Sequence, residues 1–289
     1  MKQLHLIQSC PSDMYFLWQV EVQLTNFRKY GYSHLCRELI FIPADRAHLG
    51  VPAMWKKLED KFPEAKFFYY IDDGSCLRDI QSCNYIPLLR LYCLKKHFTQ
   101  YPELANDAIF YHDADILFTK RINFQPYLQD DNTCYLSDTA GYLNLEYFDS
   151  KVSAVDESKL EQFKEVDVLN DVAKFSGITR DIVAQNNAGT GGAQYLLKGV
   201  DAQFFDDAYK ASMQIRSYLQ LINQFFIKGD TPGDKENNGY QSWVADMVAV
   251  LHGLWKRGIK TTCPKELDFA WATDPISKIK EVAIFHNAG

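Results

Sequence analysis

Two aspartates, Asp113 and Asp115, lie one residue apart inside the apolar stretch at residues 108–118. The residues on either side are the aliphatic and aromatic types that fill a strand buried on both faces. Side chains at positions i and i+2 of an extended chain point to the same side, so the two carboxylates repel each other unless a cation lies between them. A divalent cation that also binds phosphate groups is the usual partner of such a pair. The flanking apolar residues favour this metal–phosphate site over the alternative, in which both aspartates only cap the strand end and the next turn.

Strands and helices alternate up to this pair. We expect strands at residues 4–7, 39–42, 66–71 and 108–118, separated by helices at 14–29, 54–61 and 86–98. This alternation predicts an α/β fold with a mostly parallel sheet and helices on both faces. Ligands of such sheets bind beyond the carboxyl ends of the strands. The polar turns at 8–13, 72–74 and 113–115 fall at those ends, which makes a nucleotide pocket plausible there.

The rest of the chain gives a less regular pattern. We expect a short strand at 134–136, a charged surface helix or mobile insertion at 152–180, and helices at 204–226 and 240–255. Residues 228–239 form a polar loop long enough to act as a lid, and residues 282–289 read as a strand that ends near His286. The glycine-rich segment 186–195 has neither the Gly-x-Gly-x-x-Gly spacing of a dinucleotide site nor the lysine of a P-loop.

Composition limits the class of protein. The chain has 289 residues, 47% of them hydrophobic, which is enough for one large domain or two tightly joined halves. A net charge of −6 argues against a broad phosphate-binding surface. Seven cysteines without a Cys-x-x-Cys pair predict reduced thiols and no zinc site. Because the sequence has neither a signal peptide nor an apolar run long enough to span a membrane, we expect a cytoplasmic protein.

Together these segments resemble metal-dependent glycosyltransferases of the GT-A fold. Residues 111–118 are similar to the Asp-x-Asp segment of that family, and Arg90 to a basic residue that these enzymes place near the nucleotide or the first aspartate. Residues 187–195 resemble the segment that lines the donor sugar. Residues 284–289 look like the carboxy-terminal strand whose histidine completes the metal site.

The resemblance implies a Rossmann-like GT-A domain over residues 1–289. Residues 1–125 would bind the nucleotide sugar, and residues 126–289, with a charged surface insertion at 150–182, would bind the acceptor. The reaction would transfer a sugar, from a UDP-sugar before other donors, to an acceptor hydroxyl. The acceptor stays open between a glycan, a protein, a small molecule and a hydroxymethylated base of phage DNA, and the oligomeric state is open as well.

The resemblance also assigns residues to the two ligands. Asp113, Asp115 and His286 would hold Mn²⁺ or Mg²⁺, and the imidazole would favour manganese. Asp113 could bind the ribose instead, and His286 could simply lie on a buried strand without a ligand role. The residues expected at the donor are Gln8, Asp72, Asp73, Arg90, Asp113, Asn187, Gly189 and Gly192.

Asp246 is the carboxylate expected at the reacting carbon, because it lies within an otherwise apolar helix. As a general base it would give inversion, and as a nucleophile or ion-pair stabiliser it would serve a retaining enzyme. Gln194 is the alternative residue beneath the anomeric carbon. A structural role is also open, in which Asp246 pairs with Lys256 or Arg257 nearby.

Two other functions fit parts of the pattern. A metal-dependent nucleotidyltransferase or phosphohydrolase also needs paired aspartates at a strand end, but it predicts further carboxylates near the pair or a basic glycine-rich loop. A non-catalytic carbohydrate-binding protein could keep the fold without the activity. The sequence favours the transferase over both.

Overall fold

The computed structural model describes residues 2–73, 85–226 and 239–287, and its described strands form two sheets. The larger sheet has seven strands in the order β3-β2-β1-β4-β7-β6-β8, and the smaller has three in the order β5-β10-β9. The strands are β1 Leu4–Pro11, β2 Cys36–Ile42, β3 Lys66–Ile71, β4 Ala108–Tyr111, β5 Ile116–Phe118, β6 Thr133–Ser137, β7 Gly192–Lys198, β8 Lys260–Thr262, β9 Phe269–Trp271 and β10 Ile284–His286.

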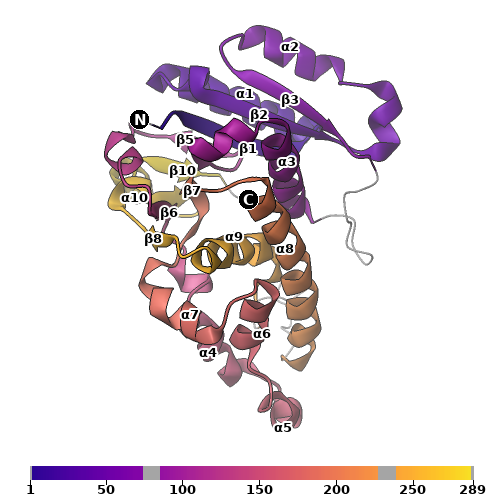
Figure 1. Cartoon of the computed structure of the whole chain (residues 1–289), viewed down its shortest axis with the longest axis vertical. Coiled ribbons are helices and arrows are strands. Elements are labelled where there is room, and N and C mark those ends of the chain that lie inside the picture. The colour runs from indigo at the N-terminus through magenta and orange to yellow at the C-terminus, as the bar shows by residue number, and fades with distance from the viewer. Residues whose placement is uncertain (1, 74–84, 227–238, 288–289) are drawn as a thin grey trace.

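Helices cover both faces of the larger sheet (Figure 1). Helices α1 and α2 pack on one face, and α3, α8 and α9 pack on the other. Helices α4–α7 gather beyond α9, at the opposite end of the molecule from α2. The helices are α1 Met14–Tyr30, α2 Ala53–Lys61, α3 Ile86–Gln100, α4 Leu145–Ser150, α5 Leu160–Phe163, α6 Val168–Phe175, α7 Arg180–Asn186, α8 Ala202–Ile222, α9 Ala245–Lys256 and α10 Ile276–Glu281.

The central strands are buried because their successive side chains enter two different cores. On β1, Leu6 packs with α1 and α2, whereas Ile7 packs with the α3 side. On β4, Phe110 packs with α1 and α2, and Ile109 packs with the α3 side. Alternation of this kind requires apolar residues at every position of a strand covered on both faces. This is why the sequence shows continuous apolar runs there.

Strand directions confirm the predicted α/β class with a mostly parallel sheet between helices. Strands β3, β2, β1 and β4 are parallel to one another. Strand β7 is antiparallel to β4, and β6 is antiparallel to β7. Strand β7 was not expected as an element, because the glycines of segment 186–195 read as a turn. In the structure that segment closes α7 and then enters the sheet.

Three details of the sequence-based prediction were wrong. The expected strand at 108–118 is two strands, since the chain leaves the larger sheet after β4 and joins the smaller one at β5. Strand β1 continues to Pro11, so the expected turn at 8–13 begins inside the strand. Segment 152–180 is more than a surface insertion, because α6 buries Val168 and Val172 in the main core. The expected lid, apart from Gly239, lies outside the described residues.

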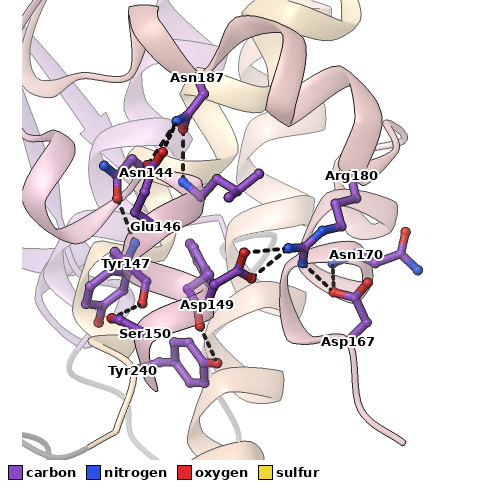
Figure 2. A network of polar contacts seen from close by, with 12 residues as sticks. Asn144, Glu146, Tyr147, Asp149, Ser150, Asp167, Asn170, Arg180, Asn187 and Tyr240 are labelled. Carbon is purple, nitrogen blue, oxygen red and sulfur yellow. Dashed lines mark hydrogen bonds and ion pairs between the residues drawn. The ribbon is translucent and has the colours of Figure 1, made fainter. Parts of the chain in front are cut away.

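Ion pairs join α4, α6 and α7 (Figure 2). The guanidinium of Arg180 on α7 bonds Asp149 on α4 at 2.6 Å and Asp167, the cap of α6, at 2.9 Å. One arginine therefore joins three helices.

Among the described residues, no helix combines the length and the apolar character needed to cross a bilayer.

A polar pair lies inside the sheet, where Gln8 on β1 faces Glu38 on β2 in the parallel register. Both side chains are buried, and the Gln8 amide donates to the Glu38 carboxylate. Burial raises the pKa of Glu38 to about 8, although the hydrogen bond from Gln8 acts in the opposite direction. The folded protein therefore keeps a protonated carboxyl group in its core at neutral pH.

We predict that Glu38→Gln removes a pH-dependent penalty on stability. Between its ordinary pKa of 4.5 and about 8, Glu38 binds a proton in the folded but not in the unfolded chain. Its contribution to the free energy of unfolding then falls as the pH rises, by up to about 1.4 kcal/mol per pH unit. In urea denaturation from pH 5 to pH 8, the free energy of unfolding of the variant should rise steadily relative to that of the wild type. Parallel curves for the two proteins would contradict the prediction, and Glu161→Gln, at an exposed surface carboxylate, serves as the control.

Candidate active site

A pocket of about 580 Å³ opens where β1 and β4 reach their carboxyl ends. Its polar lining includes Asp113 and Asp115 from the turn after β4, Arg90 from α3, Asp246 from α9 and His286 from β10. These residues are far apart in the sequence, but all of their side chains face one space. The pocket lies where parallel α/β sheets usually bind ligands.

The turn that carries the two aspartates is fixed from α1. The Gln23 amide donates to the carbonyl oxygen of Asp113 at 2.8 Å and to that of Ile116 at 3.3 Å. Asn26, nearly one helical turn later, accepts from the amide N–H of Phe118 at 2.8 Å and donates to its carbonyl oxygen at 3.0 Å. These bonds replace the ladder that the chain loses between the two sheets. The sequence did not reveal either role, because polar residues in a helix usually face solvent.

Strand β10 brings His286 to the aspartate pair. It runs antiparallel to β5 with His286 opposite Ile116, and the amide N–H of Asn287 donates to the carbonyl oxygen of Asp115 at 3.0 Å. The imidazole Nε2 lies 3.4 Å from Asp113 Oδ2 and 3.3 Å from Asp115 Oδ1. All three ligand atoms lie within 4.8 Å of one another.

This donor set fits a divalent transition metal. Two carboxylate oxygens and one imidazole nitrogen are ligands suited to manganese, whereas magnesium prefers oxygen ligands alone. Burial pushes the pKa of Asp115 upward, but its interactions with His286, a backbone N–H and Arg90 outweigh it, so the pKa lies below its usual value. Asp115 is therefore a carboxylate at neutral pH, as a metal ligand must be.

Arg90 bridges two of the pocket carboxylates. Its guanidinium forms ion pairs with Asp113 and with Asp246, and its side chain is 12% exposed. Burial alone lowers the pKa of Arg90, but the attraction of Asp246 and the nearby hydroxyls raises it overall, so the residue stays charged. One arginine thus compensates part of the negative charge, and a cation at the metal ligands would balance the rest.

Asp246 is held from two sides. One carboxylate oxygen binds Arg90, and the other accepts from the Tyr85 hydroxyl at 3.3 Å. That hydroxyl also accepts from the amide N–H of Asp246 at 3.0 Å. The structural pairing of Asp246 with Lys256 or Arg257 was wrong, because those cations bind Asp207 and Asp201 on the outside of the molecule. Asp246 instead faces the pocket.

Gln194 lies one layer behind the pocket wall. Its amide lies between the hydroxyl of Ser137, at 2.7 Å, and Nδ1 of His286, at 3.1 Å. The preceding residue, Ala193, lines the pocket and has φ of 64°, an unusual backbone conformation for a residue with a side chain.

The glycines expected at the sugar make close packing contacts in the structure. A Cβ on Gly189 would lie 2.2 Å from the carbonyl oxygen of Thr261, and one on Gly192 would lie 2.6 Å from the side chain of Met247. Asn187 bonds Glu146 at 2.9 Å and accepts from the amide N–H of Leu145 at 3.0 Å (Figure 2). These three residues are not among those that line the pocket, so their part in donor binding stays a prediction.

Of the other residues expected at the donor, Gln8 lies on β1, and Asp72 and Asp73 directly follow β3. Gln8 is enclosed between β1 and β2 with Glu38. Asp72 is buried at the end of β3, two strands away from β1. Asp73 binds Lys96 at 2.7 Å and the Tyr92 hydroxyl at 3.2 Å. None of the three is among the described residues that line the pocket, and their donor role also stays a prediction.

Aromatic residues form much of the apolar wall; Trp243 and Trp271 suit stacking on a sugar from the sequence alone, whereas the part of Tyr15 and Phe16 was not predicted. Tyr15 and Phe16 come from the start of α1, and Trp243 precedes α9. Tyr15 is 55% exposed and Trp243 is 50% exposed. Trp271 stacks on the imidazole of His286 with ring centroids 4.7 Å apart. The sequence does hold one indication of this wall. Tyr15 is a large aromatic residue outside the apolar stripe that faces the core, and such a residue can indicate a binding surface.

Comparison with known proteins gives structural neighbours only. No protein-family model matches the sequence, and the comparison with curated proteins gives no match. The solved structures that are similar include the galactosyltransferase LgtC in complex with donor and acceptor sugar analogs, at 13% identity and a TM-score of 0.45. An active-site mutant of LgtC is similar at 11% identity and a TM-score of 0.44. In both comparisons 99% of this chain and 87% of the other chain are covered.

We predict that Arg90→Met destabilises the metal-free protein by about 3–5 kcal/mol, since it leaves Asp113 and Asp246 without their shared cation. Urea denaturation in EDTA measures the loss. The double variant Arg90→Met, Asp246→Leu removes a buried charge together with the arginine and should recover part of it. A cost below about 1 kcal/mol for Arg90→Met, as for an exposed ion pair, would show that the bridge contributes little.

Proposed function

We propose that this protein is a metal-dependent glycosyltransferase of the GT-A type, which transfers a sugar from a nucleotide-sugar donor to an acceptor hydroxyl. The observation that carries the proposal is the convergence of Asp113, Asp115 and His286 in one pocket at the carboxyl ends of parallel strands. A nucleoside diphosphate departs slowly unless its charge is neutralised. A site that presents metal ligands to a pocket of ligand size suits that requirement.

Asp113, Asp115 and His286 would hold the cation, Mn²⁺ in preference to Mg²⁺. When bound, the cation would neutralise the diphosphate as the bond to the sugar breaks. Asp113 would keep one oxygen on Arg90 and turn the other to the cation, because its two oxygens already face these two directions. Arg90 would thereby fix the orientation of the first aspartate.

The aromatic wall would hold the apolar faces of the donor. Tyr15, Trp243 and Trp271 offer ring surfaces around the pocket. Nucleobases and sugar rings both present flat apolar faces that stack on aromatic side chains. A UDP-sugar is the first donor to test. Residues 1–125 are the proposed nucleotide-sugar-binding half and residues 126–289 the proposed acceptor-binding half, although Trp243, Trp271 and His286 of the second half would also face the donor. The acceptor stays open between a glycan, a protein and a modified DNA base.

Asp246 is the proposed carboxylate beside the reacting carbon. Its two oxygens are engaged by Arg90 and Tyr85, so neither one is free to take a proton from an acceptor hydroxyl. This arrangement favours stabilisation of positive charge on the sugar over proton abstraction. The nucleotidyltransferase and phosphohydrolase alternatives predict further carboxylates near the pair; among the described residues the possible metal ligands are two aspartates and a histidine, and the nearby Asp246 is paired with Arg90.

The proposal is tested by offering the purified protein UDP-, GDP- and CMP-sugars with Mn²⁺, with Mg²⁺ and with EDTA. We expect release of the nucleoside diphosphate, by transfer or by slow hydrolysis, from one donor class and only with a metal. Turnover that persists in EDTA, or the absence of any nucleotide binding, would refute the proposed function.

A second prediction concerns Asp115→Asn, which removes one ligand charge. We expect the variant to lose metal-dependent nucleotide binding in calorimetric titrations while it keeps a cooperative unfolding transition. Asp131→Asn, at an exposed aspartate outside the pocket, should bind like the wild type. Unchanged binding by Asp115→Asn would place the metal site elsewhere.

A further inference from the structure

A buried line of polar groups runs behind His286, away from the pocket. The Gln194 amide contacts Nδ1 of His286 at 3.1 Å on one side and Oγ of Ser137 at 2.7 Å on the other. The same Ser137 hydroxyl lies 2.7 Å from the carbonyl oxygen of Leu267. Gln194 and Ser137 are completely buried, and His286 is 4% exposed. The line therefore has to satisfy its hydrogen bonds internally.

Counting the available protons shows which group donates and which accepts in each hydrogen bond of this line. The carbonyl oxygen of Leu267 can only accept, and the Ser137 hydroxyl has one proton to give. If the amide oxygen of Gln194 faced Ser137, that single proton would have to serve two acceptors. With the amide turned the other way, Ser137 donates to Leu267 and accepts from the Gln194 amide nitrogen. The amide oxygen then faces His286 and accepts from Nδ1–H.

This direction determines the tautomer of His286. A proton held at Nδ1 leaves a lone pair at Nε2, the atom that lies 3.3 Å from Asp115 Oδ1 and 3.4 Å from Asp113 Oδ2. Together with these two carboxylate oxygens, the Nε2 lone pair completes a set of three ligand atoms that a cation could bind.

We propose that Gln194 is a positioning residue, which holds His286 in the Nδ1–H tautomer and so orients Nε2 as a metal ligand. The inference rests on the metal site of the proposed function but not on sugar transfer. Partners of this kind raise the basicity of a ligand histidine and fix its ring, and their loss typically costs 10–100-fold in metal affinity. Gln194 acts here through His286 rather than on the sugar.

Calorimetric titration of the full chain with Mn²⁺ alone tests this role. Gln194→Met keeps the length of the side chain but cannot accept a hydrogen bond, so we expect Mn²⁺ affinity to fall about 10–100-fold. Gln194→Glu still accepts from Nδ1–H but cannot donate to Ser137, so we expect it to recover part of the affinity. Val172→Ala, a core change on α6 outside the pocket, controls for lost stability and should bind Mn²⁺ like the wild type.

A second measurement reads the tautomer directly. Nitrogen-15 spectra of the metal-free protein, labelled at histidine and assigned with His286→Gln, should show His286 protonated at Nδ1 in the wild type. The same nucleus should move toward the Nε2–H form in Gln194→Met. An Nε2–H wild type, or full Mn²⁺ affinity in Gln194→Met, would overturn the inference. If the wild type binds no Mn²⁺, the proposed function fails, and the spectra still decide whether Gln194 sets the tautomer.

Discussion

The structure of the pocket depends on the compensation of negative charge among partly buried carboxylates. Asp113 and Asp115 come from a turn and Asp246 from a helix, and Arg90 joins Asp113 to Asp246. Carboxylates at this depth are unstable unless each has a cation or several hydrogen-bond donors. The arginine on α3 and the tyrosine hydroxyl at Asp246 each meet part of this requirement.

The turn that carries the aspartate pair lies between two sheets and is held by hydrogen bonds from other elements. Strand β4 ends in the larger sheet and β5 begins the smaller one, so the turn between them cannot rely on either ladder. Side chains of α1 supply the missing hydrogen bonds through Gln23 and Asn26, and β10 supplies another through Asn287. Rigid elements therefore hold the carboxylates from both sides, which is what a preorganised metal site requires.

Helix α1 serves three purposes with three of its faces. Leu17, Val20 and Leu24 pack in the core beneath the sheet. Gln23 reaches the turn after β4, and Tyr15 contributes to the aromatic wall of the pocket. A helix with these duties cannot present a purely polar outer face, and this explains the large exposed aromatic residues at its beginning.

The sequence by itself determined the elements of the first half and the presence of a carboxylate pair at a strand end. Strand β3 and helix α1 follow their predicted limits closely, because apolar periodicity is a local property that survives folding. Tertiary structure alone decided which distant groups meet. The register of β10 against β5 directs His286 toward the aspartates, and a shift by one residue would turn it away. The partnership of Arg90 with Asp246 and the enclosure of Gln8 beside Glu38 likewise arise from strand order and helix packing, which no local pattern in the sequence encodes.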